Sequence, residues 1–415
     1  MHFKSTISLP AAFNRLAWSN LAAQSAEQIG LAATPIVAVL ALNAGAGETG
    51  LLHTAQTLPF LLLSIPAGLL ADRTSRRRLL VGAELLRVIS FLAILTLLML
   101  GRLALPVLAL LGFVSAAGTV ASSIAAPSLV PALVPNQTLA EANRRIELTR
   151  SAAFVAGPVL AGMLIGWGGA AAFLAAAACS AGAVSLLAGL CEPVRPAPPP
   201  RQVVHELKEG AAFVFAHPLL RPVLLTAVFF VSAFFVLQAV YVPYAIHRLG
   251  LSPSGVGATL ATAGAGMVVA ALLVPRVMRV LPFGAVMLIG PLAGLAGALV
   301  MVLTIWVPVA PLAGLSFFLF GAGPVLWTIN ALTLRQIVTP GEVLGRVSAV
   351  ISMTTTGSGT VGATVGALVG GSYGAESGLV VAALGFLVQA LLFLASPVAR
   401  LERQPEMVVS AGRSW

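Results

Sequence analysis

Long apolar runs, separated by short polar segments, dominate the chain from end to end. Each run has the roughly 20 residues that a helix needs to cross a hydrocarbon core about 30 Å thick. The runs lack the alternation of apolar and polar residues that marks a half-buried strand. We therefore predict an all-α polytopic membrane protein with twelve transmembrane helices. They cover residues 11–42, 49–71, 79–101, 104–133, 139–166, 169–190, 218–247, 252–274, 283–306, 309–337, 342–371 and 376–398.

One segment in the middle of the chain interrupts this pattern. Residues 191–217 begin with a cluster of prolines and continue as a short amphipathic helix. We interpret this segment as a cytoplasmic linker between two six-helix bundles, residues 1–190 and 218–398, with a cytoplasmic tail at 399–415. A faint internal repeat supports this division: a shift of about 204 residues lays the glycines near 162 on those near 366.

Composition and charge agree with a membrane protein and give its orientation. The 415 residues are 59% apolar and only 9% charged, against about 25% charged in soluble domains. The net charge of +10 lies in short clusters between apolar runs, which argues against a nucleic-acid-binding surface. All Lys and Arg except Arg102 and Arg248 fall on one side of the predicted spans. The positive-inside rule then predicts that both termini lie in the cytoplasm. Richness in alanine, glycine and arginine suggests a bacterial protein, for which we expect the inner membrane.

The strongest local motif lies between the second and third predicted spans. It reads Gly68-Leu-Leu-Ala-Asp72-Arg73-Thr-Ser75-Arg76-Arg77-Arg78. Gly68 would let the helix backbone approach a neighbour closely, and Asp72 could meet the positive end of a partner helix. The segment resembles the loop motif of the major facilitator superfamily, with Ser75 in place of the second glycine. The resemblance implies a cytoplasmic gate formed by Gly68, Asp72, Arg73, Arg76, Arg77 and Arg78 against the eleventh span.

Glycine-containing segments extend this resemblance and predict close helix packing. Gly157, Pro158 and Gly162 in the fifth span are similar to the tail of an antiporter motif, and the connection 131–143 resembles that of macrolide and siderophore efflux permeases. Gly362, Gly366 and Gly370 recur at four-residue spacing in the eleventh span, which gives a smooth face for helix crossing. The resemblance implies alternating access and export, with a small-molecule substrate and no cofactor.

Glu27 is the polar residue that carries most information in the predicted spans. It lies about 18 Å along its helix from Arg15, and therefore near the middle of the membrane, where ionisable groups usually face a cavity or a partner. Asn20, Gln24, Glu27 and Thr34 share one helix face. We expect Glu27 to bind a coupling proton or a cationic substrate, or else to be a structural glutamate bonded to a neighbouring helix. Glu84 and Arg87 are spaced i, i+3, and we interpret them as a local ion pair near the cytoplasmic face.

Other polar residues at membrane depth are candidates for a substrate cavity. Gln238 and Tyr241 share a helix face, as do Trp327 and Asn330, and Gln56 lies in the second span. An aromatic and amide lining would suit a bulky amphipathic substrate. Each of these residues also fits an ordinary contact between helices.

The sequence contains no catalytic or metal-binding constellation and no phosphate-binding loop of the GxxxxGK[ST] type. We expect a monomeric secondary transporter that exports a small amphipathic molecule in exchange for protons. An importer or uniporter in the same fold, and a sensor or scaffold that does not transport, remain alternative hypotheses.

Overall fold

The computed structural model describes residues 10–135, 138–190, 192 and 203–403. These residues form thirteen α-helices and one short 3-10 helix, and no strand among them, which confirms the all-helical prediction. The helices are α1 (Ala11–Leu42), α2 (Ala46–Arg73), α3 (Arg76–Met99), α4 (Leu105–Leu133), α5 (Leu139–Trp167), α6 (Gly169–Ala188), α7 (Val203–Ala216), α8 (Leu220–His247), α9 (Pro253–Val280), α10 (Phe283–Leu303), α11 (Ala310–Val338), α12 (Gly341–Tyr373), α13 (Ala375–Leu394) and the 3-10 helix η2 (Pro397–Arg400).

Eleven of these helices are long and apolar enough to cross a membrane. The exception among the predicted spans is α12, which is long enough at 33 residues but carries many glycines and hydroxyl side chains that lower its mean hydropathy. The remaining helix, α7, is the short amphipathic one expected before the seventh span. The chain is therefore a multi-pass membrane protein.

The chain forms two compact units. The N-terminal unit comprises Met1–Ala44, Leu58–Pro199 and Ser252–Ala261, and the C-terminal unit comprises Gly45–Thr57, Pro200–Leu251 and Thr262–Trp415. The first part of α2 thus belongs to the C-terminal unit, and the first part of α9 to the N-terminal unit. The division of the sequence into bundles at 1–190 and 218–398 stays a prediction.

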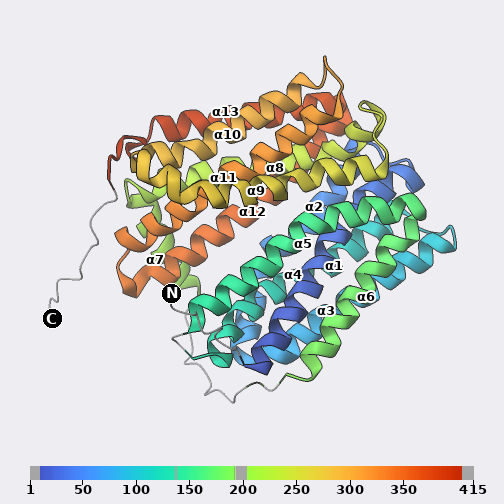
Figure 1. Cartoon of the computed structure of the whole chain (residues 1–415), viewed down its shortest axis with the longest axis horizontal. Helices are drawn as coiled ribbons and strands as arrows, with labels where there is room; N and C mark the ends of the chain where they lie inside the picture. Colours follow the sequence, from blue (N-terminus) through green and yellow to red (C-terminus); the bar gives the residue numbers. More distant parts are fainter. Residues whose placement is uncertain (1–9, 136–137, 191, 193–202, 404–415) are drawn as a thin grey trace, which may run out of the picture. The chain divides into compact units, whose positions relative to one another are not determined.

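In the N-terminal unit, α1 packs along α5 and α6, and α3 packs along α4 and α6 (Figure 1). Glycine allows the closest of these approaches. A Cβ atom at Gly157 of α5 would clash with Gln28 of α1. Gly162 lies against the carbonyl group of Pro253, and the carbonyl group of Pro158 lies against Gly257.

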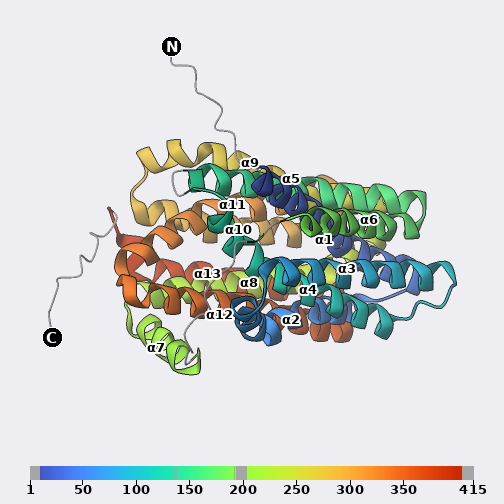
Figure 2. The ribbon, with the colours of Figure 1, turned by 90° about the horizontal axis from the view of Figure 1, so that it is seen from below.

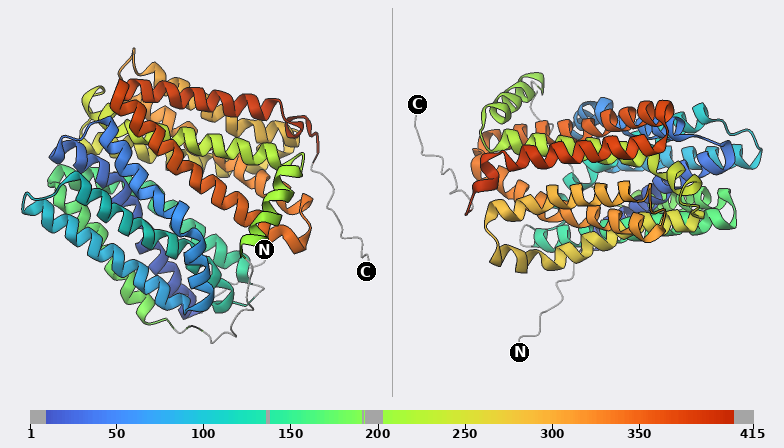
Figure 3. Two further views of the ribbon diagram at one scale, coloured as in Figure 1. Left: turned by 180° about the vertical axis from the view of Figure 1, so that it is seen from behind. Right: turned by 90° about the horizontal axis from the view of Figure 1, so that it is seen from above.

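In the C-terminal unit, α8 contacts both α12 and α13 along their lengths (Figure 3). The glycines at four-residue spacing on α12 form one continuous seam with α8. The pairs along this seam are Gly362 with Ser232, Gly366 with Val236, and Gly370 with Val240. Ser232 also donates a hydrogen bond across the seam to the carbonyl group of Ser358, at 3.1 Å. In this structure these glycines are packing residues within one unit.

The short helix α7 packs beside α12 at the edge of the C-terminal unit (Figure 2). Val214 on its apolar side is fully buried. Gly210 lies against the backbone of Arg346, and Glu209 forms an ion pair with the Arg346 side chain. The amphipathic pattern of this segment therefore matches a helix that covers the end of α12.

His217 joins α7 to α8 and caps the start of α8. Its Nδ1 atom accepts hydrogen bonds from the backbone N–H groups of Leu219 and Leu220, at 3.2 and 3.3 Å. Desolvation lowers the pKa of His217 below its ordinary value, which agrees with an imidazole that must stay neutral to accept these bonds. The stability that it contributes is therefore present above about pH 6.5, the unfolded pKa, and is lost as the pH falls.

We expect the melting temperature of the wild-type protein to fall between pH 7.5 and pH 5.5 partly through His217. In His217→Asn the amide oxygen can still accept an N–H bond at the helix start but cannot be protonated in this range, so the decrease should be smaller. Thermal unfolding at several pH values measures this. An identical pH dependence in both proteins would contradict the assignment.

Candidate functional site

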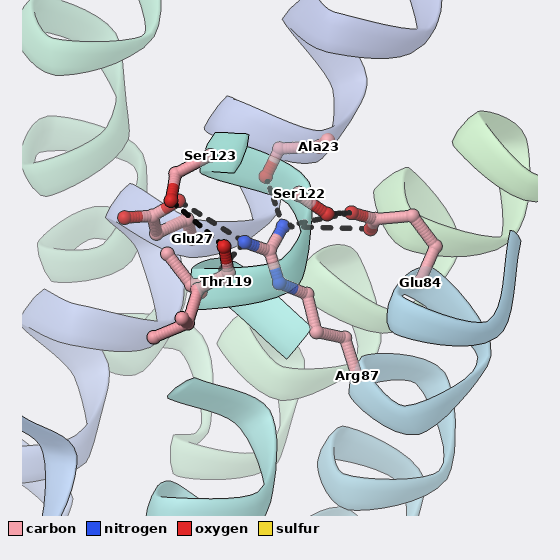
Figure 4. Close-up of polar contacts among 8 residues, drawn as sticks. Ala23, Glu27, Glu84, Arg87, Thr119, Ser122 and Ser123 are labelled. Carbon is pink, nitrogen blue, oxygen red and sulfur yellow. Dashed lines mark hydrogen bonds and ion pairs between the residues drawn. The ribbon is translucent and has the colours of Figure 1, made fainter. Parts of the chain in front are cut away.

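A buried ion cluster lies inside the N-terminal unit, with Arg87 of α3 at its centre (Figure 4). Its guanidinium group lies between two carboxylates, 3.1 Å from Glu27 of α1 and 3.1 Å from Glu84 of α3. Arg87 also donates hydrogen bonds to Thr119 Oγ1 of α4, at 2.6 Å, and to the carbonyl oxygen of Ala23, at 3.0 Å. The cluster thus connects three helices.

The two carboxylates differ in their surroundings. The side chains of Arg87 and Glu84 are only 2% and 1% exposed, whereas that of Glu27 is 17% exposed. Glu84 also accepts a hydrogen bond from Ser122 at 3.3 Å. Glu84 is therefore the enclosed partner of Arg87, and Glu27 is the carboxylate that a proton or a small ion can reach.

The charge of the cluster does not balance when all three groups are ionised. Two carboxylates and one guanidinium carry a net charge of −1, and a net charge in an apolar interior is costly. One bound proton or monovalent cation makes the cluster neutral. The arrangement is therefore suited to exchange one positive charge while it stays buried.

The local i, i+3 ion pair expected between Glu84 and Arg87 is present. Sequence reasoning did not foresee that this pair is buried and that Arg87 also pairs with Glu27. The helix arithmetic that placed Glu27 could have indicated the link, because Arg87 lies eleven residues, or about 16 Å, beyond Arg76 at the start of α3.

The polar stripe predicted on α1 divides among different roles. Asn20 donates a hydrogen bond to Thr149 of α5 at 3.1 Å, and Thr34 bonds to the Gly30 carbonyl of its own helix. Gln24 is half-buried. Glu27 is the residue of this stripe that contacts Arg87 and so belongs to the ion cluster.

The candidate cavity residues of the C-terminal unit also differ from one another in burial and in hydrogen bonding. Tyr241 is fully buried, with its ring edge-on to Phe317 at 4.6 Å, and Gln238 is half-buried. Asn330 is fully buried and donates to the Leu326 carbonyl oxygen at 2.8 Å. Gln56 is buried in the part of α2 that belongs to this unit, and its Oε1 atom has no partner among the described residues.

Trp327 lines an apolar cavity of about 390 Å³ inside the C-terminal unit. The walls come from α8, α10, α11, α12 and α13, with Val223, Phe230 and Ile351 among the apolar lining residues. This volume lies in the range of small-molecule sites, 300–1,000 Å³. Asn330, which shares a helix face with Trp327 in the sequence, is not among the lining residues.

The loop between α2 and α3 is held by Glu192, a residue that the sequence analysis did not identify. Ser75 of this loop caps the start of α3, because its hydroxyl oxygen accepts a hydrogen bond from the Arg78 N–H at 3.3 Å. The carboxylate of Glu192, which follows α6, accepts hydrogen bonds from the Ser75 hydroxyl group at 2.5 Å and from the backbone N–H groups of Arg76 and Arg77, each at 3.1 Å. An acidic group at a helix N-terminus is favourable. Ser75 therefore has a structural role in place of the family's glycine.

The arginines of the same loop bind backbone carbonyl groups. The Arg77 side chain donates to Leu187 and Ala188 at the end of α6, and the Arg76 side chain donates to Ser128. A Cβ atom at Gly68 would have no described atom within 4 Å, so the close approach expected there is not found in this structure. Asp72 lies in α2, but its side chain is outside the described part. The gate assigned to these residues and Arg73 stays a prediction.

Among the described residues, no group of three or more His, Cys, Asp or Glu is arranged to hold a metal ion. The site candidates are therefore the ion cluster of the N-terminal unit and the cavity of the C-terminal unit. Both are built from side chains that project inward from transmembrane helices, as in proteins that carry solutes across membranes.

Comparison with known families assigns the class. Residues 13–363 match the model of the Major Facilitator Superfamily, so the chain belongs to this family and is a membrane transporter of small molecules. The enterobactin exporter EntS of Escherichia coli O6:K15:H31 (strain 536 / UPEC) is 27% identical over 358 residues, which cover 83% of this chain and 82% of that protein.

Solved structures share the fold at low sequence identity. A bacterial homologue of the iron transporter ferroportin in its inward-facing state has a TM-score of 0.74 at 16% identity, covering 93% of this chain and 98% of that chain. The nucleoside transporter NupG has a TM-score of 0.71 at 12% identity, covering 93% and 99%. These likenesses show the fold alone.

Proposed function

We propose that this transporter exports a small amphipathic molecule in exchange for protons, with Glu27 as the residue that binds the coupling proton. The observation that carries this proposal is the ion cluster of Glu27, Arg87 and Glu84, which is one positive charge short of neutrality. Export, as the direction, is supported by the similarity to an enterobactin exporter. The lysine and arginine distribution supports a bacterial inner-membrane location with both termini in the cytoplasm.

The geometry suggests how proton binding would alter the protein. Ionised Glu27 holds Arg87 through a 3.1 Å ion pair that joins α1 to α3. A proton on Glu27 removes its charge and leaves Arg87 paired with Glu84 alone, so the link between the two helices weakens. A change at this link, inside one unit, is the local event through which protonation would favour one conformation of the transporter.

We expect purified wild-type protein to release protons when a transported amphipathic compound binds, and Glu27→Gln to release none. The amide of glutamine keeps the size of the side chain but does not bind a proton near neutral pH. The measurement is the pH change of a weakly buffered, detergent-solubilised sample during addition of candidate compounds. Glu376→Gln is the matched control, because Glu376 forms an exposed pair with Arg248 in the C-terminal unit and should leave proton release unchanged.

Glu84→Gln separates the two buried carboxylates. If Glu27 binds the proton, Glu84→Gln should still show compound-dependent release, although at a shifted pH. Compound binding without proton release in the wild type would overturn the exchange mechanism and favour a uniporter. Proton release that persists in Glu27→Gln would overturn the role of Glu27.

A further inference from the structure

The cavity of the C-terminal unit contains polar atoms that have no partner. Trp327 Nε1, Arg335 Nε and Gln389 Oε1 are buried, and no described residue forms a hydrogen bond with any of them. All three residues line the cavity. Because buried polar groups are almost always hydrogen-bonded, three unpaired ones around one apolar space indicate a site whose partners come from a ligand.

Arg335 sets the charge of that ligand. It is half-buried beside apolar lining residues, and its buried Nε atom forms no hydrogen bond with any described residue. Arg346 and Arg248 in the same unit, in contrast, pair with Glu209 and Glu376. A guanidinium group is always charged, and a charge beside an apolar cavity is stabilised most by an opposite charge. The partner that fits Arg335 is therefore an anionic oxygen.

Trp327 and Gln389 form a second polar region of the cavity, separate from Arg335. Trp327 packs against Gly290, and Gln389 Oε1 would lie 3.4 Å from a Cβ atom at Gly294, so both side chains lie along neighbouring turns of α10. Trp327 Nε1 can only donate and Gln389 Oε1 can only accept. A hydroxyl group, which can do both, would satisfy this pair.

The helix spacing fixes the length between the two polar regions. Pro324, Trp327, Ala331 and Arg335 line the cavity from one face of α11, and Trp327 and Arg335 are eight residues apart, or about 12 Å along the axis. The rest of the lining is mostly apolar and includes Val223, Phe230 and Ile351, with Thr328 and Thr355 as its hydroxyl residues. The site therefore has an anion-binding end, an apolar middle and a hydrogen-bonding end.

We propose that this cavity binds an amphipathic organic anion, with the acidic group at Arg335 and a hydroxyl group at Trp327 and Gln389. This inference rests on the proposed transport function, because it names the substrate class. A proton bound at the N-terminal cluster and an organic anion bound in the C-terminal unit would then be held at separate sites on the two units.

The test uses two fluorescent probes that share their aromatic rings and differ in charge. These are 1-anilinonaphthalene-8-sulfonate, which is anionic, and N-phenyl-1-naphthylamine, which is neutral. Binding is followed by energy transfer from Trp327 in full-length protein in which the four other tryptophans are replaced by phenylalanine. Three of them, Trp18, Trp167 and Trp306, are exposed, so their replacement should disturb packing little. Phosphatidylcholine vesicles, which carry no net charge, avoid competition from anionic lipids.

We expect the anionic probe to bind more tightly than the neutral one, and Arg335→Gln to weaken the anionic probe about tenfold, as expected for a lost hydrogen bond to a charged group. The neutral probe should change less than about twofold. Arg335→Lys should retain part of the preference. Arg276→Gln, which removes an exposed arginine of α9, is the matched control and should behave as the wild type.

Equal affinity for the anionic probe in Arg335→Gln and in the Arg276→Gln control would overturn the proposal. The two proposals can fail independently. Anion preference that persists in Glu27→Gln, in a protein that never releases protons, would support the cavity and reject proton exchange. Proton release without any effect of Arg335→Gln would support proton exchange and reject the anion site.

Discussion

Replacement of Arg87 by alanine is expected to destabilise the protein by about 3–5 kcal/mol, which is the cost of removing one partner of a buried ion pair and leaving the other charge unpaired. The change leaves Glu27 and Glu84 close together without a cation, and it removes the donor that holds Thr119. The loss should appear as a much lower melting temperature in detergent, followed by tryptophan fluorescence. Arg144→Ala, which removes an exposed i, i+3 pair with Glu141, should change the melting temperature little, because solvent screens such a pair.

A combined variant distinguishes lost charge from lost packing. Arg87→Met with Glu27→Gln and Glu84→Gln removes all three charges and keeps side chains of similar length. Since buried ion clusters can often be replaced by neutral residues at little cost, this variant should recover much of the stability that Arg87→Ala loses. Equal stability of Arg87→Ala and Arg144→Ala would contradict the buried cluster.

Gly362→Ala should destabilise the protein by about 1–3 kcal/mol, because it inserts a methyl group into the seam between α8 and α12. The new Cβ atom would meet the backbone of Ser232, and backbone cannot move aside as a flexible side chain can. The two helices must separate, and the Ser232–Ser358 hydrogen bond nearby should weaken.

Gly345→Ala on the same helix provides the matched control, with the opposite sign. A Cβ atom there would have no described atom within 4 Å, so the change should stabilise the helix by up to about 1 kcal/mol through the higher helix propensity of alanine. Thermal unfolding of both variants measures the difference. If both shift in the same direction by the same amount, the close seam at Gly362 is not present in the folded protein.

The fold could be predicted from sequence because the bilayer imposes a strong constraint on each span separately. The boundaries of α1, predicted at 11–42, agree with the structure, since a long apolar run needs no knowledge of its neighbours. The span predicted at 342–371 also corresponds to a helix, α12, although its glycine and hydroxyl residues lower its mean hydropathy below that of the other spans.

The candidate sites were predictable only where one residue carried the signal. Glu27 is conspicuous as a carboxylate deep in an apolar run, and Trp327 as an indole in another. Arg87, Arg335 and Gln389 gain their significance from side chains on other helices, which no local pattern reports. Glu192 was missed for a related reason: it falls at the start of a proline-containing linker, where its contact with α3 cannot be read from spacing.

The arginines near the end of α6 link membrane insertion to the folded state. Arg77 and Arg15 donate to the last carbonyl groups of α6 and its following turn, so charges that we predict to orient the chain in the membrane also act as helix caps in the folded protein. A lysine would supply the orienting charge equally well, but it lacks the planar fork that binds two carbonyl groups at once. An arginine at such a position therefore meets two requirements, one of charge and one of shape.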